Sequence, residues 1–250
     1  MPGADVPPGP LLRVGAPSPA LYKNSAPAAS RSDVADEGAN ESERSDDEGR
    51  MRLIGEGLAC ERGGRELFGD VAIGLSPGEG LLIEGPNGSG KTTLIRAIAG
   101  LGRFAAGSLT LEGGDKEASL GEQAHYVGHA DATKPQLTVA ENLAFWASFL
   151  GGGDIGGGLA AFDLHDIADL PAQFLSAGQR RKLSLSRLEL VPRPIWLLDE
   201  PTASLDRVAR QRLTRLMDAH MESGGILLAT THMELGAAFA QRLALGGAAP

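Results

Sequence analysis

A glycine-rich segment, GPNGSGKT at residues 85–92, has the residue types and spacing of a phosphate-binding loop. An apolar run at 81–84 precedes it and a helix-like run at 93–100 follows, so the loop joins a strand to a helix. The glycines let backbone N–H groups turn toward phosphate oxygens, and the helix N-terminus adds partial positive charge. We predict that Lys91 holds the β and γ phosphates during catalysis and that Thr92 binds Mg²⁺. The alternative, a plain glycine-rich turn, is disfavoured by the flanking elements. The residues predicted to bind the nucleotide here are Gly85, Pro86, Asn87, Gly88, Ser89, Gly90, Lys91, Thr92 and Thr93.

Two carboxylates, Asp199 and Glu200, end a second apolar run and stand before Pro201. An aspartate at a strand end beside a phosphate loop is placed to hold Mg²⁺, so Asp199 joins Thr92 as a predicted metal ligand. Glu200 is predicted to act catalytically on the water that attacks the γ-phosphate. The alternative is that the pair only caps a loop.

The third apolar run, residues 226–232, ends in His232. A lone histidine at a strand end is often structural, but this one is placed to contact a γ-phosphate. The runs at 81–84, 195–200 and 226–232 are apolar without alternation, as in strands covered on both faces. Because the carboxyl ends of parallel strands meet at one edge, the sequence predicts an α/β fold with a single shared site.

The segment LSAGQ at 175–179 precedes a predicted helix over 180–190. A serine and a glycine at a helix N-terminus offer a hydroxyl and approachable N–H groups, which make a second anion site. One nucleotide needs only one phosphate loop, so the second site must serve another nucleotide. Arg180, Arg181 and Lys182 are predicted to form a solvated face.

Composition divides the chain at about residue 50. Residues 1–50 hold 7 of the 15 prolines and an acidic run, and they are predicted to be disordered. They are either a regulatory tail or an over-extended start. Residues 51–250 carry the α/β pattern, with a small helical subdomain at about 137–190 that a flexible glycine-rich stretch, 151–158, interrupts.

Charge and composition exclude several classes of protein. The net charge of −9 disfavours nucleic acid as a partner. The only cysteine, Cys60, has no disulfide partner in the chain, which favours a reducing compartment. No apolar run approaches the roughly 18 residues of a membrane span, and the N-terminus lacks the pattern of a secretory signal.

Taken in order, these motifs resemble those of the nucleotide-binding subunit of ATP-binding-cassette (ABC) transporters. Residues 85–92 match Walker A, 175–179 the signature, 195–201 Walker B, 203–206 the D-loop, and His232 the switch histidine. The resemblance implies a P-loop NTPase fold of the ABC type, with ATP and Mg²⁺ as cofactors. It also implies a homodimer of cassettes in which each ATP lies between Walker A of one copy and the signature of the other. The residues that would bind ATP in trans are Ser176, Ala177, Gly178 and Gln179.

A narrower similarity, to the ATPases of haem exporters in cytochrome c maturation, is carried by residues 60–65, 126–131, 134–135, 137–143 and 175–188. It implies a peripheral subunit on the cytoplasmic face of the inner membrane, bound to integral membrane subunits resembling cytochrome c maturation proteins B and C. There it would use ATP to release haem-loaded chaperone. An ABC ATPase for another substrate, or an ATP-gated binding module with little hydrolysis, are the alternatives. A P-loop kinase or GTPase is disfavoured because neither needs LSAGQ.

Two positions depart from the ABC pattern. Most cassettes carry a glutamine after the strand that ends near residue 127, but this chain reads VGHADATKP there. His129 or Asp131 could substitute, or the loop could act without a metal contact. The position where an aromatic ring usually stacks on adenine is occupied by Arg62, whose guanidinium plane can also stack on a base.

Overall fold

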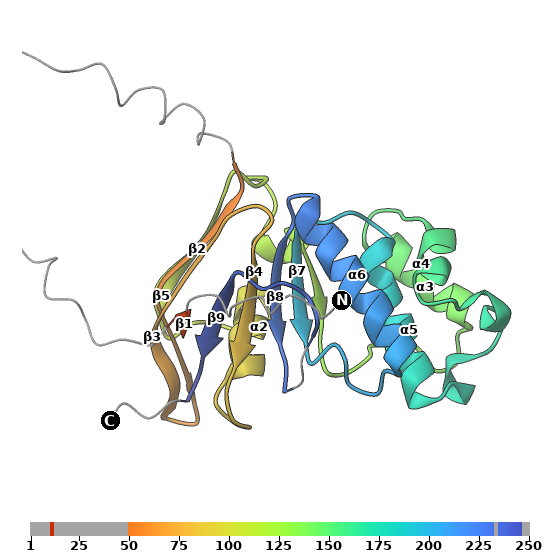
Figure 1. The fold of residues 1–250 in the computed structure, drawn as a ribbon, viewed down its shortest axis with the longest axis horizontal. Coiled ribbons are helices and arrows are strands. Elements are labelled where there is room, and N and C mark those ends of the chain that lie inside the picture. Colours follow the sequence, from red (N-terminus) through yellow and green to blue (C-terminus); the bar gives the residue numbers. More distant parts are fainter. Residues whose placement is uncertain (1–10, 13–49, 233–234, 247–250) are drawn as a thin grey trace, which may run out of the picture.

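The computed structural model describes residues 11–12, 50–232 and 235–246. A parallel sheet forms the centre, with an antiparallel sheet on one side and most of the helices on the other (Figure 1). The parallel sheet has the order β1-β9-β4-β8-β7-β6. Its strands are β1 (Leu11–Leu12), β4 (Gly80–Glu84), β6 (Ala124–Val127), β7 (Ile195–Asp199), β8 (Ile226–Thr230) and β9 (Gln241–Ala244).

The antiparallel sheet has the order β3-β2-β5. Its strands are β2 (Arg52–Arg62), β3 (Arg65–Leu75) and β5 (Ala106–Glu112). Buried side chains of this sheet form one core with α2 (Lys91–Ile98) and with one face of the parallel sheet, where Leu81 and Ile83 lie. Leu82 points to the opposite face and belongs to a second core. Both faces of β4 are therefore buried, which explains its unbroken apolar run.

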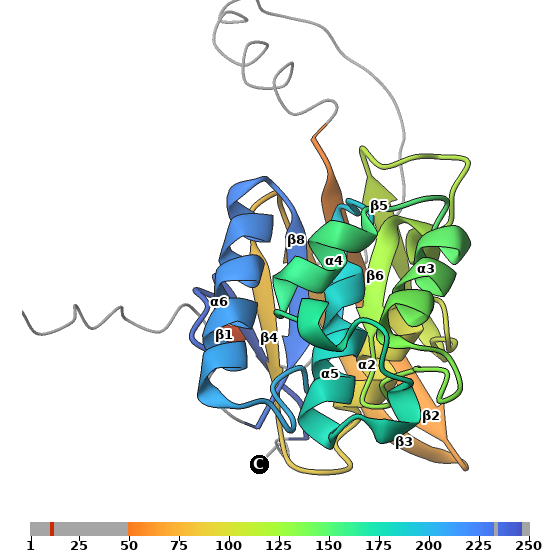
Figure 2. The ribbon, with the colours of Figure 1, turned by 90° about the vertical axis from the view of Figure 1, so that its right-hand side faces the viewer.

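The second core joins the other face of the parallel sheet to α6 (Arg207–Glu222) and to the helices between β6 and β7. Those helices, α3, α4 and α5, are grouped away from the antiparallel sheet (Figures 1 and 2). Their bounds are α3 (Val139–Phe149), α4 (Ile155–Ala161) and α5 (Ala177–Ser186), and the short 3-10 turns are η1 (Leu120–Gln123), η2 (His165–Ile167), η3 (Ala172–Phe174) and η4 (Arg187–Glu189). In the described ranges no helix has the length and apolar composition needed to cross a bilayer.

The structure differs from the sequence-based expectation at the glycine-rich stretch. Its last three glycines lie inside α4, and only the part before Asp154 interrupts the helices. A Cβ at Gly158 would lie 3.0 Å from Leu190 Cδ2, so the glycine lets α4 approach the segment after α5 closely. The Asp154 N–H donates to the Leu190 carbonyl at 3.0 Å, which fixes the helix start against the same residue. The predicted helix over 180–190 likewise ends earlier, because η4 follows α5 at Arg187.

Within the N-terminal fifty residues, Leu11–Leu12 pair in parallel with β9. Arg50 is also described, and it precedes β2. The other residues of the segment lie outside the described ranges, so the disorder expected of them stays a prediction.

A buried histidine couples the stability of the fold to pH. His125 on β6 is 3% exposed, and its Nε2 lies 2.7 Å from the Val191 carbonyl oxygen. Burial lowers the pKa of His125 from 6.5 to about 4, although the bond to Val191 opposes the shift. His125 therefore binds a proton near pH 6.5 in the unfolded chain, but only near pH 4 in the folded chain.

We expect the free energy of unfolding to fall by about 3 kcal/mol from this residue as the pH drops from about 6.5 to 4. Above that window the contribution is fully present. In His125→Leu this share of the pH dependence should disappear, as measured by urea unfolding at pH 7 and pH 4.5. His165→Gln, at an exposed position, is the matched control and should keep the parental slope. An unchanged slope in His125→Leu would contradict the assignment.

Candidate nucleotide site

The phosphate-binding loop joins β4 to α2 through glycines in backbone conformations that other residues rarely adopt. Gly85 has a φ of 147°, and a Cβ there would collide with the Leu245 carbonyl oxygen. Gly90 caps α2 with a φ of 99°, and a Cβ there would lie 2.8 Å from Phe68 Cδ1. These glycines let the loop turn tightly between β9 and the antiparallel sheet, so that the N-terminus of α2 opens at the loop.

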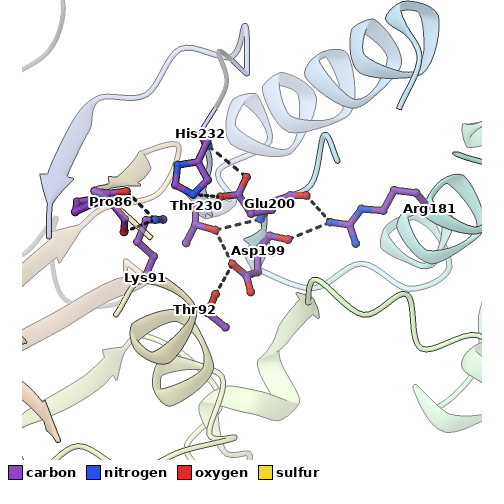
Figure 3. A network of polar contacts seen from close by, with 9 residues as sticks. Pro86, Lys91, Thr92, Arg181, Asp199, Glu200, Thr230 and His232 are labelled. Atoms are coloured by element: carbon purple, nitrogen blue, oxygen red, sulfur yellow. Dashed lines mark hydrogen bonds and ion pairs between the residues drawn. The ribbon is translucent and has the colours of Figure 1, made fainter. Parts of the chain in front are cut away.

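Lys91 starts α2 and is only 7% exposed. Its ammonium group donates to the carbonyl oxygens of Gly85, at 2.7 Å, and Pro86, at 3.1 Å. The side chain therefore folds back across the loop, as Figure 3 shows, and its charge lies against the loop backbone. A cation in this place can neutralise phosphate oxygens held by the same loop.

Thr92 and Asp199 lie side by side although 107 residues separate them. The Thr92 hydroxyl donates to Asp199 Oδ1 at 3.1 Å, and the Thr230 hydroxyl donates to the same oxygen at 2.6 Å. Asp199 Oδ2 is buried and has no hydrogen-bond partner among the described residues. A buried carboxylate oxygen without a donor, next to a hydroxyl, fits a hard divalent cation.

Glu200 leaves β7 in a left-handed backbone conformation, with a φ of 49°. Such a conformation costs a non-glycine residue about 1–3 kcal/mol and persists only where its surroundings impose it. The Glu200 N–H is bound by both oxygens of Thr230, at 3.2 Å and 3.1 Å. The side chain then reaches His232, whose Nε2 lies 3.3 Å from Glu200 Oε1 and whose N–H donates to Oε2 at 3.3 Å.

The loop, Glu200 and His232 share a cleft of about 390 Å³. It is lined by Arg62, Leu67, Asn87, Gly88, Gly90, Lys91, Thr92, Thr93, His129, Glu200 and His232. Glu200 and His232, the predicted catalytic residues, therefore line the same cleft as the loop. Arg62 lines it as well, at its rim. The signature residues 176–179 do not line it. His129 lines the cleft, whereas the Asp131 carboxylate faces Arg181 at 3.3 Å.

Comparison with known proteins identifies the family. The family described as ABC transporter matches residues 68–203. The cytochrome c biogenesis ATP-binding export protein CcmA of Nitrobacter winogradskyi is 55% identical over 201 residues, which are 80% of this chain and 100% of that protein. CcmA of Rhodopseudomonas palustris strain BisB18 is 57% identical over the same shares of both chains. The chain belongs to the CcmA family. Members of this family are ABC-type ATPases, so the resemblance inferred from the motifs, the nucleotide as ligand and the ATPase activity are confirmed.

Solved structures agree with the fold expected of the CcmA family. The ATP-binding subunit of an ABC transporter superposes with a TM-score of 0.63 and 26% identity, covering 72% of this chain and 79% of that chain. A dimeric ATP-binding cassette in a post-hydrolysis state, bound to ADP and phosphate, gives a TM-score of 0.62 at 22% identity, covering 72% and 88%. The predicted α/β fold of the P-loop ABC type is therefore confirmed.

The family signature starts α5. Ser176 caps the helix: its hydroxyl accepts from the Gln179 N–H at 3.2 Å, and its own N–H donates to Gln179 Oε1 at 2.8 Å. Ser176 and Ala177 are exposed, and a Cβ at Gly178 would lie 3.0 Å from the Ser204 carbonyl oxygen. The helix N-terminus therefore faces outward in the single CcmA-family chain, next to the D-loop.

The prediction that residues 180–182 form a solvated face is wrong for Arg181. This side chain is 2% exposed, and it donates to carbonyl oxygens of Gly128 at 2.7 Å, Asp199 at 3.0 Å, Glu200 at 2.8 Å and Pro201 at 3.2 Å. Burial lowers the pKa of Arg181, and the neighbouring carboxylates oppose that shift. Carbonyls that leave parallel strands at one edge need donors, and the guanidinium supplies them.

The other two cations of that run are partly buried. Lys182 binds Asp206 Oδ2 at 2.7 Å, and Arg180 donates to the Leu175 carbonyl at 2.6 Å. Thr230 was also missed by sequence reasoning; its place two residues before His232, at the end of a buried strand, was the available signal.

Proposed function

We propose that this chain is the ATP-hydrolysing subunit of a membrane ABC complex for cytochrome c biogenesis, in which ATP drives the release of haem-loaded chaperone. The observation that carries the proposal is the convergence of Lys91, Thr92, Glu200 and His232 at one cleft, with Asp199 bound to the Thr92 hydroxyl. The chain that holds this site is at least 55% identical to two export proteins of cytochrome c biogenesis. The share of these relatives that the chain covers supports extending their named role to it.

In this proposal Thr92 and Asp199 hold Mg²⁺, which when bound supplies charge stabilisation at the phosphates. Lys91 neutralises the β and γ phosphates, and Glu200 accepts a proton from the attacking water. His232, within 3.3 Å of Glu200, orients that carboxylate and contacts the γ-phosphate. Arg62, at the rim of the cleft, stacks on the adenine.

We further propose that two copies of the chain form a head-to-tail homodimer. Ser176 and Ala177 are exposed and lie outside the cleft that the loop lines, which supports a role on a nucleotide bound to the other copy. In that arrangement Ser176, Ala177, Gly178 and Gln179 bind the γ-phosphate in trans, and each chain alone provides half of two sites.

The dimer predicts a nucleotide-dependent crosslink between Asn87→Cys in one copy and Ser176→Cys in the other, since both positions are exposed. In a Glu200→Gln background with Mg-ATP, a short bifunctional thiol reagent should join most copies into dimers, as measured by denaturing gel electrophoresis. Cys60 is buried and provides a quiet background. Lys116→Cys paired with Ser176→Cys is the control and should give monomer. Equal crosslinking with and without ATP would contradict the sandwich.

Membrane attachment is proposed through partner subunits resembling cytochrome c maturation proteins B and C, on the cytoplasmic face of the inner membrane. Phe145 and Phe149 on α3 are 39% and 72% exposed and contact Trp146 edge-on. Trp146 also lines a cleft of about 420 Å³ that reaches the loop after β6. An exposed aromatic patch beside a cleft supports an interface with another protein.

Copurification and deletion test the assignment. The tagged chain should bring down integral membrane subunits with haem-handling features, and its deletion should abolish c-type cytochromes, as measured by haem staining of membranes. Reintroduced parental chain should restore them, and Lys91→Ala should not. If c-type cytochromes persist after deletion and the copurified subunits handle another substrate, the chain energises another transporter.

A further inference from the structure

Arg181 joins three separate parts of the molecule. It stands on α5, five residues after Ser176, the capping residue of the signature. One end of its guanidinium binds the loop after β6, through the Gly128 carbonyl at 2.7 Å and Asp131 Oδ1 at 3.3 Å. The other end binds the carbonyls that follow β7.

At the end of β7, Arg181 contacts the backbone that sets the direction of the Glu200 side chain. Nη2 of Arg181 donates to the Asp199 carbonyl at 3.0 Å and to the Glu200 carbonyl at 2.8 Å (Figure 3). Glu200 lies between these bonds and the bonds to Thr230. Its left-handed backbone turns the carboxylate into the cleft. A conformation of this kind needs external contacts on both sides to persist. Thr230 supplies one side and Arg181 the other.

We propose that Arg181 is a positioning residue. Through it, the orientation of the Glu200 side chain depends on the positions of α5 and of the loop after β6. The inference rests on the proposed role of Glu200 as the base. A shift of α5 or of Gly128 moves the guanidinium, and with it the carbonyl that fixes the Glu200 turn. Because general-base catalysis is steep in distance, a displacement of about 1 Å suffices to lower turnover strongly without touching the phosphates.

The arrangement also assigns different tasks to His129 and Asp131, the two residues that could substitute for the glutamine of other cassettes. His129 lines the nucleotide cleft, whereas Asp131 binds Arg181 and its carboxylate is 25% exposed. A change in the position of the Asp131 loop therefore changes the position of Glu200 through Arg181. Replacing Asp131 with asparagine weakens that contact without removing a buried side chain.

The test compares Arg181→Lys, Asp131→Asn and the control Arg212→Lys in the full chain with its membrane partners. Arg212 has the same ion-pair distance to Asp163, 3.3 Å, but its side chain on α6 is 33% exposed, against 3% for Arg181. We expect Arg181→Lys to lower kcat for Mg-ATP by on the order of 10- to 100-fold, with KM and the ATP affinity within about twofold of the parent. Asp131→Asn should lower kcat several-fold in the same way, and Arg212→Lys should not change it.

The decisive readout is the combination with Glu200→Gln. If Arg181 acts through Glu200, Arg181→Lys should cause no further loss in that background. Additive losses, a parental kcat in Arg181→Lys, or a joint fall of kcat, ATP affinity and melting temperature would overturn the proposal. If Arg181→Lys does not fold, Asp131→Asn carries the same comparison alone and with Glu200→Gln. Equal hydrolysis by the parent and Glu200→Gln would instead refute the proposed base.

Discussion

Replacing Glu200 with glutamine is expected to lower the turnover number for ATP by about 10²- to 10⁴-fold while ATP binding is retained. The amide has the shape of the carboxylate and can still accept the His232 N–H bond seen at 3.3 Å, so the turn at the end of β7 should persist. What it loses is the ability to accept a proton from the attacking water. Phosphate release under saturating Mg-ATP measures the effect, and equilibrium binding of a fluorescent ATP analogue measures retention.

Glu222→Gln is the matched control for this variant. Glu222 is exposed at the end of α6 and does not line the cleft, so its change should leave turnover at the parental rate. The Glu200→Gln variant should also accumulate the crosslinked dimer, because it binds ATP without hydrolysing it. Turnover of Glu200→Gln near the parental rate would remove Glu200 from the mechanism and leave another group to activate the water.

Replacing Lys91 with alanine is expected to weaken ATP binding by about 10- to 100-fold, because a charge-assisted contact to phosphate contributes about 1.5–3 kcal/mol. The substitution also removes the two bonds from Nζ to the Gly85 and Pro86 carbonyls, at 2.7 Å and 3.1 Å. Turnover should therefore fall further than affinity. Titration with ATP, followed by calorimetry, measures the first effect.

Lys116→Ala provides the comparison for that loss. Lys116 is exposed in the loop after β5 and does not line the cleft, so its variant should bind ATP with parental affinity. A melting temperature close to the parental value for Lys91→Ala would separate a lost phosphate contact from a lost fold. Normal ATP affinity in Lys91→Ala would contradict the phosphate-loop assignment.

The parts of the site that sequence reasoning predicted are those that local order determines. Residues 85–92 form a phosphate loop because their glycines, lysine and threonine are consecutive, and the chain direction alone delivers them to the N-terminus of α2. Asp199 ends a strand that is buried throughout, and an unbroken apolar run indicated that burial. Because the carboxyl ends of parallel strands meet at one edge of the sheet, this order also predicted that Asp199 lies near Thr92.

Arg181 shows where such reasoning fails. A run of three cations after a helix start suggests a solvated face, because the sequence does not reveal which carbonyls lack donors. Gly128 lies 53 residues away from Arg181 and Asp199 lies 18 away, and only the packed sheet brings their carbonyls together. Gly158 inside α4 is a similar case, since a Cβ there would lie 3.0 Å from Leu190 Cδ2, a contact between segments that meet only in the folded chain.

The sequence by itself thus predicted the chemistry of the site, namely a phosphate loop, a candidate metal-binding aspartate and a candidate base, and it determined the α/β order that joins them. The tertiary structure decided how these groups are aimed. Only packing turned Arg181 inward, placed His129 at the cleft and Asp131 against Arg181, and held Glu200 in a left-handed turn. The physical reason is that motifs depend on neighbours along the chain, whereas burial and hydrogen-bond demand depend on segments that meet only after folding.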